Sequence, residues 1–272
     1  MITLFPKTKK FAFSIVDDTD HATVERIKPI YDLLLNLNIK ITKSVWSFPS
    51  DDKNNKYYDS QTLMDDEYLE YIKWLHKNGF EIAFHGASMA SSGRDKIIEA
   101  LNNFKNNLGF YPTLYINHSM NRENIYWGHE RLNNPFFRWI MKIKHKSSRF
   151  EGHVDNSPYF WGDICQKHIK YVRNFVFNDQ NIFKINPSIP YHDEKRPFVN
   201  YWFSSSDGGS VDSFNELLKI ENQERLEKEH GICIVYTHFG NKFVQNGKIN
   251  PDTSYLLTEL SKRNGWFVPT VE

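Results

Sequence analysis

Carboxylate and imidazole side chains recur in this sequence directly after apolar runs. Together such groups can bind Zn²⁺ or a similar divalent ion, and a carboxylate or imidazole beside that ion can accept or donate a proton. The pattern therefore favours a metal-assisted catalytic site. The residues that end these runs are Asp17, Asp18 and Asp20, His85, Asn117 and His118, and Thr237 and His238.

Alternating strand-like and helix-like runs must position these groups. Residues 11–16, 39–46, 80–86 and 112–119 are rich in β-branched and aromatic residues, whereas 22–37, 65–79 and 94–109 have helical spacing of apolar residues. Successive strands joined by helices are parallel, so their C-terminal ends form one face. We therefore expect the polar groups that follow the strands to converge there.

The alternation changes after the fourth strand. Residues 121–212 contain aromatic and proline-rich segments, with a helix near 134–144 and strands near 174–177 and 200–207. We interpret this part as a long elaboration packed over one end of a single domain, residues 1–272. Regular order returns with helices over 213–230 and 252–265, a strand over 232–240 and a last strand-like run over 266–272.

Composition excludes several classes of function. The 272 residues carry 34 basic and 33 acidic side chains, a formal charge of +1, which argues against a nucleic-acid partner. Neither an apolar signal peptide nor a membrane span is evident, so we expect a cytoplasmic protein. Cys165 and Cys233 are interpreted as two buried thiols rather than a disulfide.

Each polar group also has a structural explanation. Asp17 to Asp20 could cap the helix that begins near Ala22, and for Asp20 alone a cap is the better explanation. Aromatic side chains are more often core residues than a wall for stacking sugars. The candidates for such a wall are Trp127, Tyr159, Trp161 and Trp202.

Three motifs in the expected order resemble the polysaccharide deacetylase superfamily, the NodB-homology group that includes carbohydrate esterase family 4. They are "FSIVDDTD", "EIAFHGAS" and "IVYTHFG". The resemblance implies a distorted (β/α)7 barrel and a metal-dependent hydrolase. It also implies that Asp17 is the catalytic base, that Asp18 and His85 bind the metal, and that His238 is the general acid.

Two positions depart from the family pattern. Met89 stands where the second metal-binding histidine belongs, and a thioether is a poor ligand for a hard ion. The arginine and proline-rich third motif is replaced by "INHSMNRENIYWG". We infer that His118 supplies the missing imidazole, which gives Asp18, His85 and His118 as ligands, with His153 and His192 as alternatives to His118.

Further residues are candidates for substrate binding. Arg94 could orient Asp17 or bind an anionic group of the substrate, and Asp163 could pair with His238 or hold a hydroxyl group, although a surface position and a helix cap explain them equally well. The full set of substrate-binding candidates is Arg94, Asn117, Trp127, Tyr159, Trp161 and Asp163.

The expected reaction is removal of an N-acyl group, acetyl or formyl, from an amino sugar, with Zn²⁺ as the first choice of metal. The segments at 116–128, 152–175 and 236–240 are also similar to deacetylase-like proteins of bacterial surface-polysaccharide and O-antigen biosynthesis, which implies a nucleotide-activated or lipid-linked sugar as substrate. Hydrolysis of an O-acyl ester would use the same groups. A barrel that binds a glycan or a protein partner without turnover remains the alternative to an enzyme.

Overall fold

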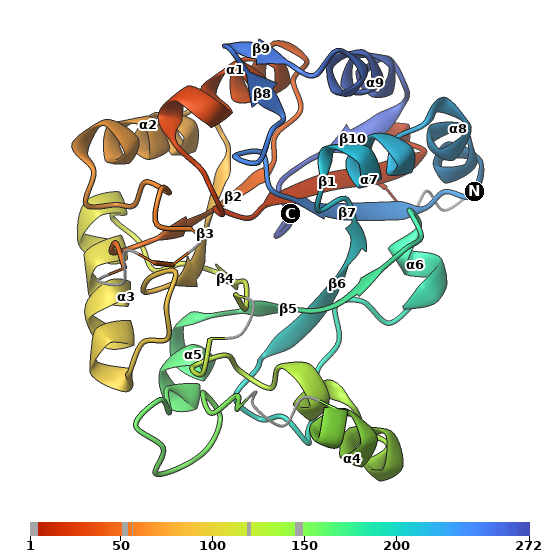
Figure 1. Ribbon diagram of the computed structural model, residues 1–272. Coiled ribbons are helices and arrows are strands. Elements are labelled where there is room, and N and C mark those ends of the chain that lie inside the picture. Colours follow the sequence, from red (N-terminus) through yellow and green to blue (C-terminus); the bar gives the residue numbers. More distant parts are fainter. Residues whose placement is uncertain (1–4, 51–53, 56, 119–120, 145–148) are drawn as a thin grey trace.

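Seven parallel strands form a closed barrel in the computed structural model, which describes residues 5–50, 54–55, 57–118, 121–144 and 149–272. Figure 1 shows these strands as a ring with helices outside it. The strands are β1 (Phe11–Asp17), β2 (Thr42–Trp46), β3 (Glu81–Gly86), β4 (Leu114–Tyr115), β5 (Tyr171–Phe177), β6 (Tyr201–Asp207) and β7 (Ile232–Thr237).

The strands pair in chain order, and β7 returns to β1 to close the ring. The closing pair is the most regular, because Ala12–Asp17 of β1 lie in continuous parallel register with Ile232–Thr237 of β7. Strand β4 is short and pairs with β3 at one position, Phe84 with Tyr115. A further strand, β10 (Gly265–Phe267), pairs with the start of β1. The expected distorted (β/α)7 barrel is confirmed.

Helices connect the strands and cover the outside of the ring (Figure 1). The expected helix over 213–230 is two helices, because the backbone is not helical at Lys219 and α8 begins after it, at Ile220. The helices are α1 (Val24–Asn36), α2 (Asp66–Lys77), α3 (Arg94–Leu108), α4 (Pro135–Lys144), α5 (Gly162–His168), α6 (Ile182–Ile185), α7 (Val211–Leu217), α8 (Ile220–Lys228) and α9 (Pro251–Ser261), with 3₁₀ turns η1 (Pro6–Thr8) and η2 (Gly128–Arg131) and a small hairpin of β8 (Val244–Gln245) and β9 (Lys248–Ile249).

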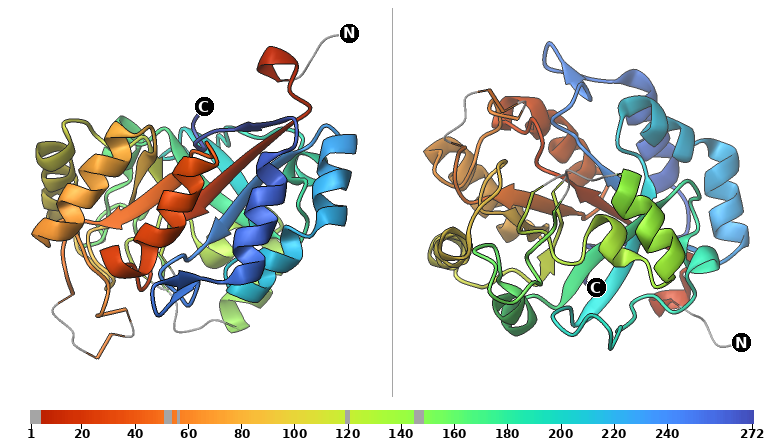
Figure 2. Two further views of the ribbon diagram at one scale, coloured as in Figure 1. Left: turned by 90° about the horizontal axis from the view of Figure 1, so that it is seen from above. Right: turned by 60° about the horizontal axis from the view of Figure 1, so that its bottom comes forward.

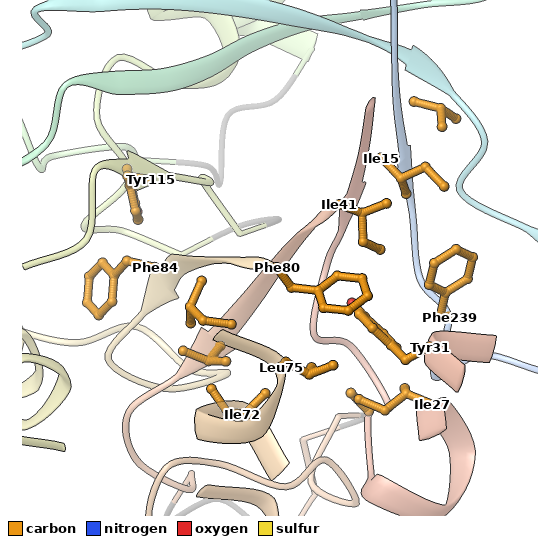
Figure 3. Packing of buried hydrophobic residues seen from close by; sticks show 14 of the residues in the cluster. Ile15, Ile27, Tyr31, Ile41, Ile72, Leu75, Phe80, Phe84, Tyr115 and Phe239 are labelled. Atoms are coloured by element: carbon orange, nitrogen blue, oxygen red, sulfur yellow. The ribbon is translucent and has the colours of Figure 1, made fainter. Parts of the chain in front are cut away.

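The main core lies between the barrel and its helices. On β1, Phe13 and Ile15 face outward and join a buried cluster with Ile27 and Tyr31 of α1. Figure 3 shows how the ring of Tyr31 lies among aliphatic and aromatic side chains from several elements. Successive side chains of a strand alternate between its two faces, so the residues between these two point the other way.

A smaller core fills the barrel itself. Its buried members come from strands or from residues that directly follow them, and no helix contributes to it, which places it inside the ring. Val16 lies between Ile15 and Asp17 on β1 and belongs to this interior, as the alternation of strand side chains requires. The buried members are Val16, Ala83, Leu114, Ile116 and Phe203.

The predicted elaboration over 121–212 is not one continuous addition. It contains β5 and β6, which are strands of the barrel itself, so the irregular parts are confined to the β4–β5 connection, with η2, α4 and α5, and the β5–β6 connection. The predicted strand near 174–177 covers only the end of β5, which begins at Tyr171, because Arg173 and Asn174 interrupt the apolar pattern of the strand. Cys165 and Cys233 are both buried and free. Among the described helices, none combines the length and apolar character needed to cross a membrane.

Candidate metal centre and active site

The alternation of strand side chains brings the candidate groups together at the barrel mouth. On each of these strands an inward residue is followed two positions later by a polar or aromatic residue on the same face, near or just beyond the C-terminal end of the strand, except for Arg173, which lies within β5. These side chains therefore extend the interior core into the mouth. The inward pairs are Val16 and Asp18, Ala83 and His85, Ile116 and His118, Tyr171 and Arg173, and Ile234 and Tyr236, with His238 following.

A cavity of about 270 Å³ opens at this mouth. Its wall combines two carboxylates, three imidazoles and a guanidinium with aromatic rings. The lining residues are Asp18, Asp20, Tyr57, His85, Asn117, His118, Trp127, Arg173, Val176, Tyr236 and His238.

Asp20, His85 and His118 form one group of possible metal ligands. Each offers a donor atom, and these atoms lie within 4.8 Å of one another. The Asp20 Oδ1 atom is 3.1 Å from Nε2 of His118, and the rings of His85 and His118 have their centroids 5.1 Å apart. All three residues are buried. His85 and His118, which the sequence predicted as metal ligands, lie in this group with Asp20, whereas the predicted ligand Asp18 lies in a second group of possible ligands with Asp20 and His238.

The ring nitrogens of His85 have no hydrogen-bond partner among the described residues, although the side chain is buried. Trp46 packs against both histidines, with centroid distances of 5.4 Å to His85 and 5.2 Å to His118, and provides no acceptor. Burial lowers the pKa of His85 to about 3, more than the nearby carboxylates raise it, so the ring is neutral. A neutral buried imidazole with an unpaired nitrogen is the form that binds a metal ion.

The backbone after His85 requires glycine. Gly86 has a φ of +123°, a conformation that residues with a side chain rarely adopt. It ends β3, and a Cβ atom built there would lie 4.0 Å from the Glu123 carboxylate. The turn lets the chain leave the strand while His85 keeps its place at the mouth.

Asp18 is held by Arg173 of β5. Both guanidinium nitrogens donate to the carboxylate, at 2.8 and 2.6 Å, and both side chains are buried. Burial by itself would raise the pKa of Asp18, but Arg173, with a smaller contribution from His238, lowers it below its ordinary value. Asp18 is therefore an ionised carboxylate facing the cavity.

His238 stands between the two cavity carboxylates. Its Nδ1 atom lies 2.8 Å from the carbonyl oxygen of Gly209, and its Nε2 atom lies 3.0 Å from Asp20 and 4.0 Å from Asp18. Burial opposes the charged form, but Asp20, Asp18 and the Gly209 carbonyl outweigh it and raise the pKa of His238 to about 9. The carbonyl fixes the proton on Nδ1 and turns Nε2 toward the cavity.

Asp17, predicted to be the catalytic base, lies on the opposite face of β1. Its carboxylate accepts hydrogen bonds from the hydroxyl of Tyr31 and the backbone N–H of Phe239, at 2.9 and 2.8 Å, and lies 2.9 Å from Nζ of Lys43. The side chains of Asp17 and Lys43 are fully buried. Burial alone would lower the pKa of Lys43, but Asp17 raises it. Asp17 belongs to the outer core because it shares a face with Phe13 and Ile15.

Asp20 was expected to cap the first helix, but Thr23 is the cap. The Thr23 side chain accepts a hydrogen bond from the backbone N–H of Arg26, and α1 begins at Val24. Asp20 instead points to His118 and His238. The pattern of three carboxylates within four residues included this cavity carboxylate, but the sequence prediction assigned it to the helix cap.

Two of the predicted substrate-binding residues line the cavity, Asn117 and Trp127. The Asn117 side chain also bonds the backbone N–H and C=O of Ile125, which fixes the loop after β4. Trp127 stacks on Arg131, whose guanidinium carbon lies 4.1 Å from the ring centre. These two contacts hold one wall of the cavity in place.

The other four predicted substrate-binding residues lie outside the cavity wall. Arg94 and Asp163 form a bidentate ion pair, with distances of 2.6 and 2.8 Å, so Asp163 neither caps α5 nor reaches His238. Tyr159 packs under the guanidinium of Arg122. Trp161 is fully buried and donates to the backbone oxygen of Glu123, so it is a core residue.

The remaining histidine alternatives also lie elsewhere. His153 accepts a hydrogen bond from the backbone N–H of Tyr126, and His192 lies beside the backbone oxygen of Asn200. Met89 is buried, and its sulfur lies 3.0 Å from the backbone nitrogen of Ser50. Trp202 is fully buried in the outer core. None of these four lines the cavity.

Sequence reasoning missed Arg173, Tyr57 and Tyr236 as cavity residues. For Arg173 a signal existed, because a charged residue inside the apolar run "YVRNFVF" needs a buried partner. Tyr236 lies two residues before His238 and faces the same way, with Arg173 stacked 4.8 Å from its ring centre. Tyr57 comes from the β2–α2 connection and contacts His118, with centroids 5.0 Å apart. No motif marked that position.

Comparison with solved structures finds the same architecture along nearly the whole chain. PuuE allantoinase and a protein assigned as a polysaccharide deacetylase from Mycobacterium smegmatis each give a TM-score of 0.54 at 12% identity, covering 98% of this chain and 90% of theirs. A protein assigned as a polysaccharide deacetylase from Pseudomonas aeruginosa PAO1 gives 0.53 at 12% identity, covering 97% and 90%. Neither the family models nor the curated proteins give a match. At this identity, the likeness establishes that the chain has the barrel fold of these proteins.

Proposed function

We propose that this chain is a metal-dependent hydrolase that removes an N-acyl group, acetyl or formyl, from an amino sugar in the biosynthesis of a bacterial surface polysaccharide. The observation that carries the proposal is the arrangement at the barrel mouth. A carboxylate held by Arg173 and an imidazole held by Gly209 stand beside a buried group of one carboxylate and two imidazoles. Titratable groups that converge in a cavity from separate strands mark a functional site.

Asp20, His85 and His118 are the residues that would hold the metal. One carboxylate and two imidazoles match the ligand preference of Zn²⁺, and three protein ligands leave a position open for catalysis. The unpaired nitrogens of His85 support this assignment, because a buried polar group without a partner is costly. When bound, such an ion supplies Lewis-acid polarisation of the amide carbonyl group.

Asp18 is the residue that we assign as general base. Its carboxylate faces the cavity, and Arg173 keeps it ionised and fixes its orientation through two hydrogen bonds. An ionised carboxylate in that position can accept the proton of an attacking water molecule. The role expected for Asp17 thus moves one residue along the chain, and the metal-binding role expected for Asp18 moves to Asp20.

His238 is the residue that we assign as general acid. The Gly209 carbonyl holds its Nδ1 proton, so Nε2 is the atom that exchanges a proton in the cavity. Protonation of the departing amine is the step that makes an amide bond break readily, and His238 lies within 4.0 Å of both cavity carboxylates. Base and acid therefore directly follow two adjacent strands, β1 and β7, whose last residues Asp17 and Thr237 are paired.

The size and lining of the cavity favour a small polar substrate. Its volume of about 270 Å³ is near the lower end for small-molecule pockets, which fits one sugar ring better than a polymer segment. Trp127 offers an aromatic face, and Asn117 and Tyr236 offer polar groups. The barrel alone does not fix the substrate, because one of the similar structures is an allantoinase.

A substrate panel tests the proposal. N-acetyl and N-formyl amino sugars, each free, nucleotide-linked and lipid-linked, are incubated with the protein loaded with Zn²⁺, Co²⁺ or Ni²⁺, and amine release is measured. O-acetyl sugars and allantoin complete the panel. We expect release from N-acyl sugars, and a loss of about 10² to 10⁴-fold in Asp18→Asn and in His238→Ala.

Asp163→Asn provides the matched control, because Asp163 is a carboxylate outside the cavity. This variant is expected to keep full activity. Turnover of allantoin or of an ester in preference to every N-acyl sugar would replace the proposed reaction. Binding of sugars without any turnover would instead identify the barrel as a binding protein.

A further inference from the structure

Helix α4 turns its apolar side chains toward solvent. Phe136, Trp139, Ile140 and Ile143 follow the helical spacing i, i+3, i+4 and i+7, so they form one stripe. Phe136 and Trp139 are 62% and 60% exposed, and Phe137 beside them is 57% exposed. An amphipathic helix of a globular domain normally buries such a stripe, as α1 does with Ile27 and Tyr31.

The helix is anchored through the 3₁₀ turn that precedes it. Arg138 pairs with Glu130 of η2, and the backbone oxygen of Glu130 accepts hydrogen bonds from Arg196. Among the side chains described in α4, Met141 is the one that is partly buried. The apolar stripe therefore faces solvent rather than the core.

The sequence of α4 and of the residues that flank it is strongly basic, although Arg138 is paired with Glu130. Residues 132–150 contain five basic and no acidic side chains, although the whole chain has a formal charge of +1. Aromatic and aliphatic residues on one face, with lysine and arginine around them, are typical of helices that lie in the interface of an anionic membrane. The basic residues are Arg138, Lys142, Lys144, Lys146 and Arg149.

The position of α4 relates the stripe to the cavity. Trp127, which lines the cavity, immediately precedes η2. Helix α4 begins four residues after the last residue of η2. In the left view of Figure 2, α4 lies on the side of the barrel opposite the two labelled chain ends. The strands point to that side, so α4 stands beside the barrel mouth.

We propose that α4 docks this protein on an anionic membrane surface, with the apolar stripe inserted among the lipid headgroups and the barrel mouth turned toward them. A second copy of the chain fits the stripe less well. A helix of ten residues is about 15 Å long, too short to cover the roughly 800 Å² per partner of a stable interface, and two such segments would bring like charges together. Docking also favours a lipid-linked sugar over a free one, a consequence that rests on the proposed function.

Vesicle binding tests the docking without any use of catalysis. Co-sedimentation is measured with vesicles of phosphatidylcholine alone and of phosphatidylcholine mixed with phosphatidylglycerol, at low and high salt. We expect binding to the anionic vesicles, weakened by salt. The affinity should fall at least about tenfold in Phe136→Ser/Trp139→Ser and in Lys142→Glu/Lys144→Glu.

Matched controls come from other helices. Tyr255→Ser removes an exposed aromatic ring from α9, and Lys228→Glu reverses a charge on α8, so both should bind vesicles like the unchanged protein. Phe136 and Trp139 are exposed, so thermal unfolding is expected to be unaffected by their replacement. Equal vesicle binding by these α4 variants would overturn the proposal. A dimer that dissociates in the Phe136→Ser/Trp139→Ser variant would assign the stripe to a second copy instead.

Discussion

Arg173 donates hydrogen bonds to both carboxylate oxygens of Asp18 across the inside of the barrel, at 2.8 and 2.6 Å. Asp18 directly follows β1 and Arg173 lies on β5, far apart in the chain, and both are buried and line the cavity. A bidentate contact of this kind fixes the plane of the carboxylate as well as its charge. The orientation of the proposed base is therefore set by a strand that carries no recognised motif.

Arg173→Lys should separate orientation from charge. Lysine keeps a positive charge but offers a single ammonium group, which cannot hold both oxygens in one plane. We expect kcat for amine release to fall by about 10 to 100-fold while metal content stays unchanged. Steady-state kinetics and metal analysis of the same preparation check this. Unchanged kcat would show that the carboxylate needs no fixed orientation.

Breaking the ion pair between Asp17 and Lys43 should lower the stability of the fold rather than the catalytic rate alone. Asp17→Ala leaves the Lys43 ammonium group buried without its partner, which costs about 3 to 5 kcal/mol of unfolding free energy. The double variant Asp17→Ala/Lys43→Met should recover most of this loss, because no unpaired charge remains. Urea denaturation of both variants measures the difference.

Activity measured on the same double variant distinguishes the two roles of Asp17. If Asp17 is structural, Asp17→Ala/Lys43→Met keeps its metal and hydrolyses substrate within about tenfold of the unchanged protein, the residual effect arising from the neighbouring Asp18. A loss as large as that of Asp18→Asn would restore Asp17 as the catalytic base.

The sequence was sufficient for the fold and for most of the groups at the mouth, but it left their roles open. Alternating strands and helices predicted the barrel, and the ends of the apolar runs predicted that His85, His118 and His238 converge. Assigning the aspartates depended on which face of β1 each one occupies. A shift of one residue moves a side chain to the opposite face, and the motif alone did not fix that register.

Counting alternate positions back from the mouth would have corrected the assignment. Phe11, Phe13 and Ile15 face the helices, so Asp17 follows them into the outer core, whereas Val16 and Asp18 face the interior. The remaining errors have another cause. Arg94 is the first residue of α3, Asp163 lies in the first turn of α5, and Tyr159 and Trp161 lie in the connection before α5. The alternation of strand side chains does not extend to these positions, so it does not indicate which of them face the cavity.

His118 should be required for metal binding. His118→Ala removes one of three ligands, and we expect metal affinity to fall by at least about 10 to 100-fold. His192→Ala is the matched control, because the sequence also allowed His192 as the third metal ligand, but this imidazole is exposed and lies in the β5–β6 connection, outside the cavity. Metal content after dialysis, measured by mass spectrometry, compares the two. Full occupancy in His118→Ala, with loss in His192→Ala, would relocate the third ligand.

The carboxyl group of Glu81 should make the unfolding free energy depend on pH. The carboxyl group lies at the start of β3, where burial raises its pKa to about 7. Hydrogen bonds from Thr42 and from the backbone of Thr270 and Val271 lower the pKa, but by less than burial raises it. The folded state therefore binds the proton more tightly than the unfolded state, whose pKa is near the ordinary value of 4.5. The stabilisation is complete below about pH 4.5 and disappears as the pH rises through about 7, with a limit of about 3 kcal/mol.

Glu81→Gln removes this dependence, because an amide stays neutral at every pH and can still accept a hydrogen bond from Thr42. We expect the unchanged protein to lose more unfolding free energy than Glu81→Gln between pH 5 and pH 8, and the variant to be the more stable of the two at pH 8. Urea denaturation at several pH values measures both. Glu123, whose pKa burial also raises to about 7, is present in both proteins, so its contribution cancels in the difference. Parallel curves for the two proteins would mean that Glu81 titrates alike in the folded and unfolded states.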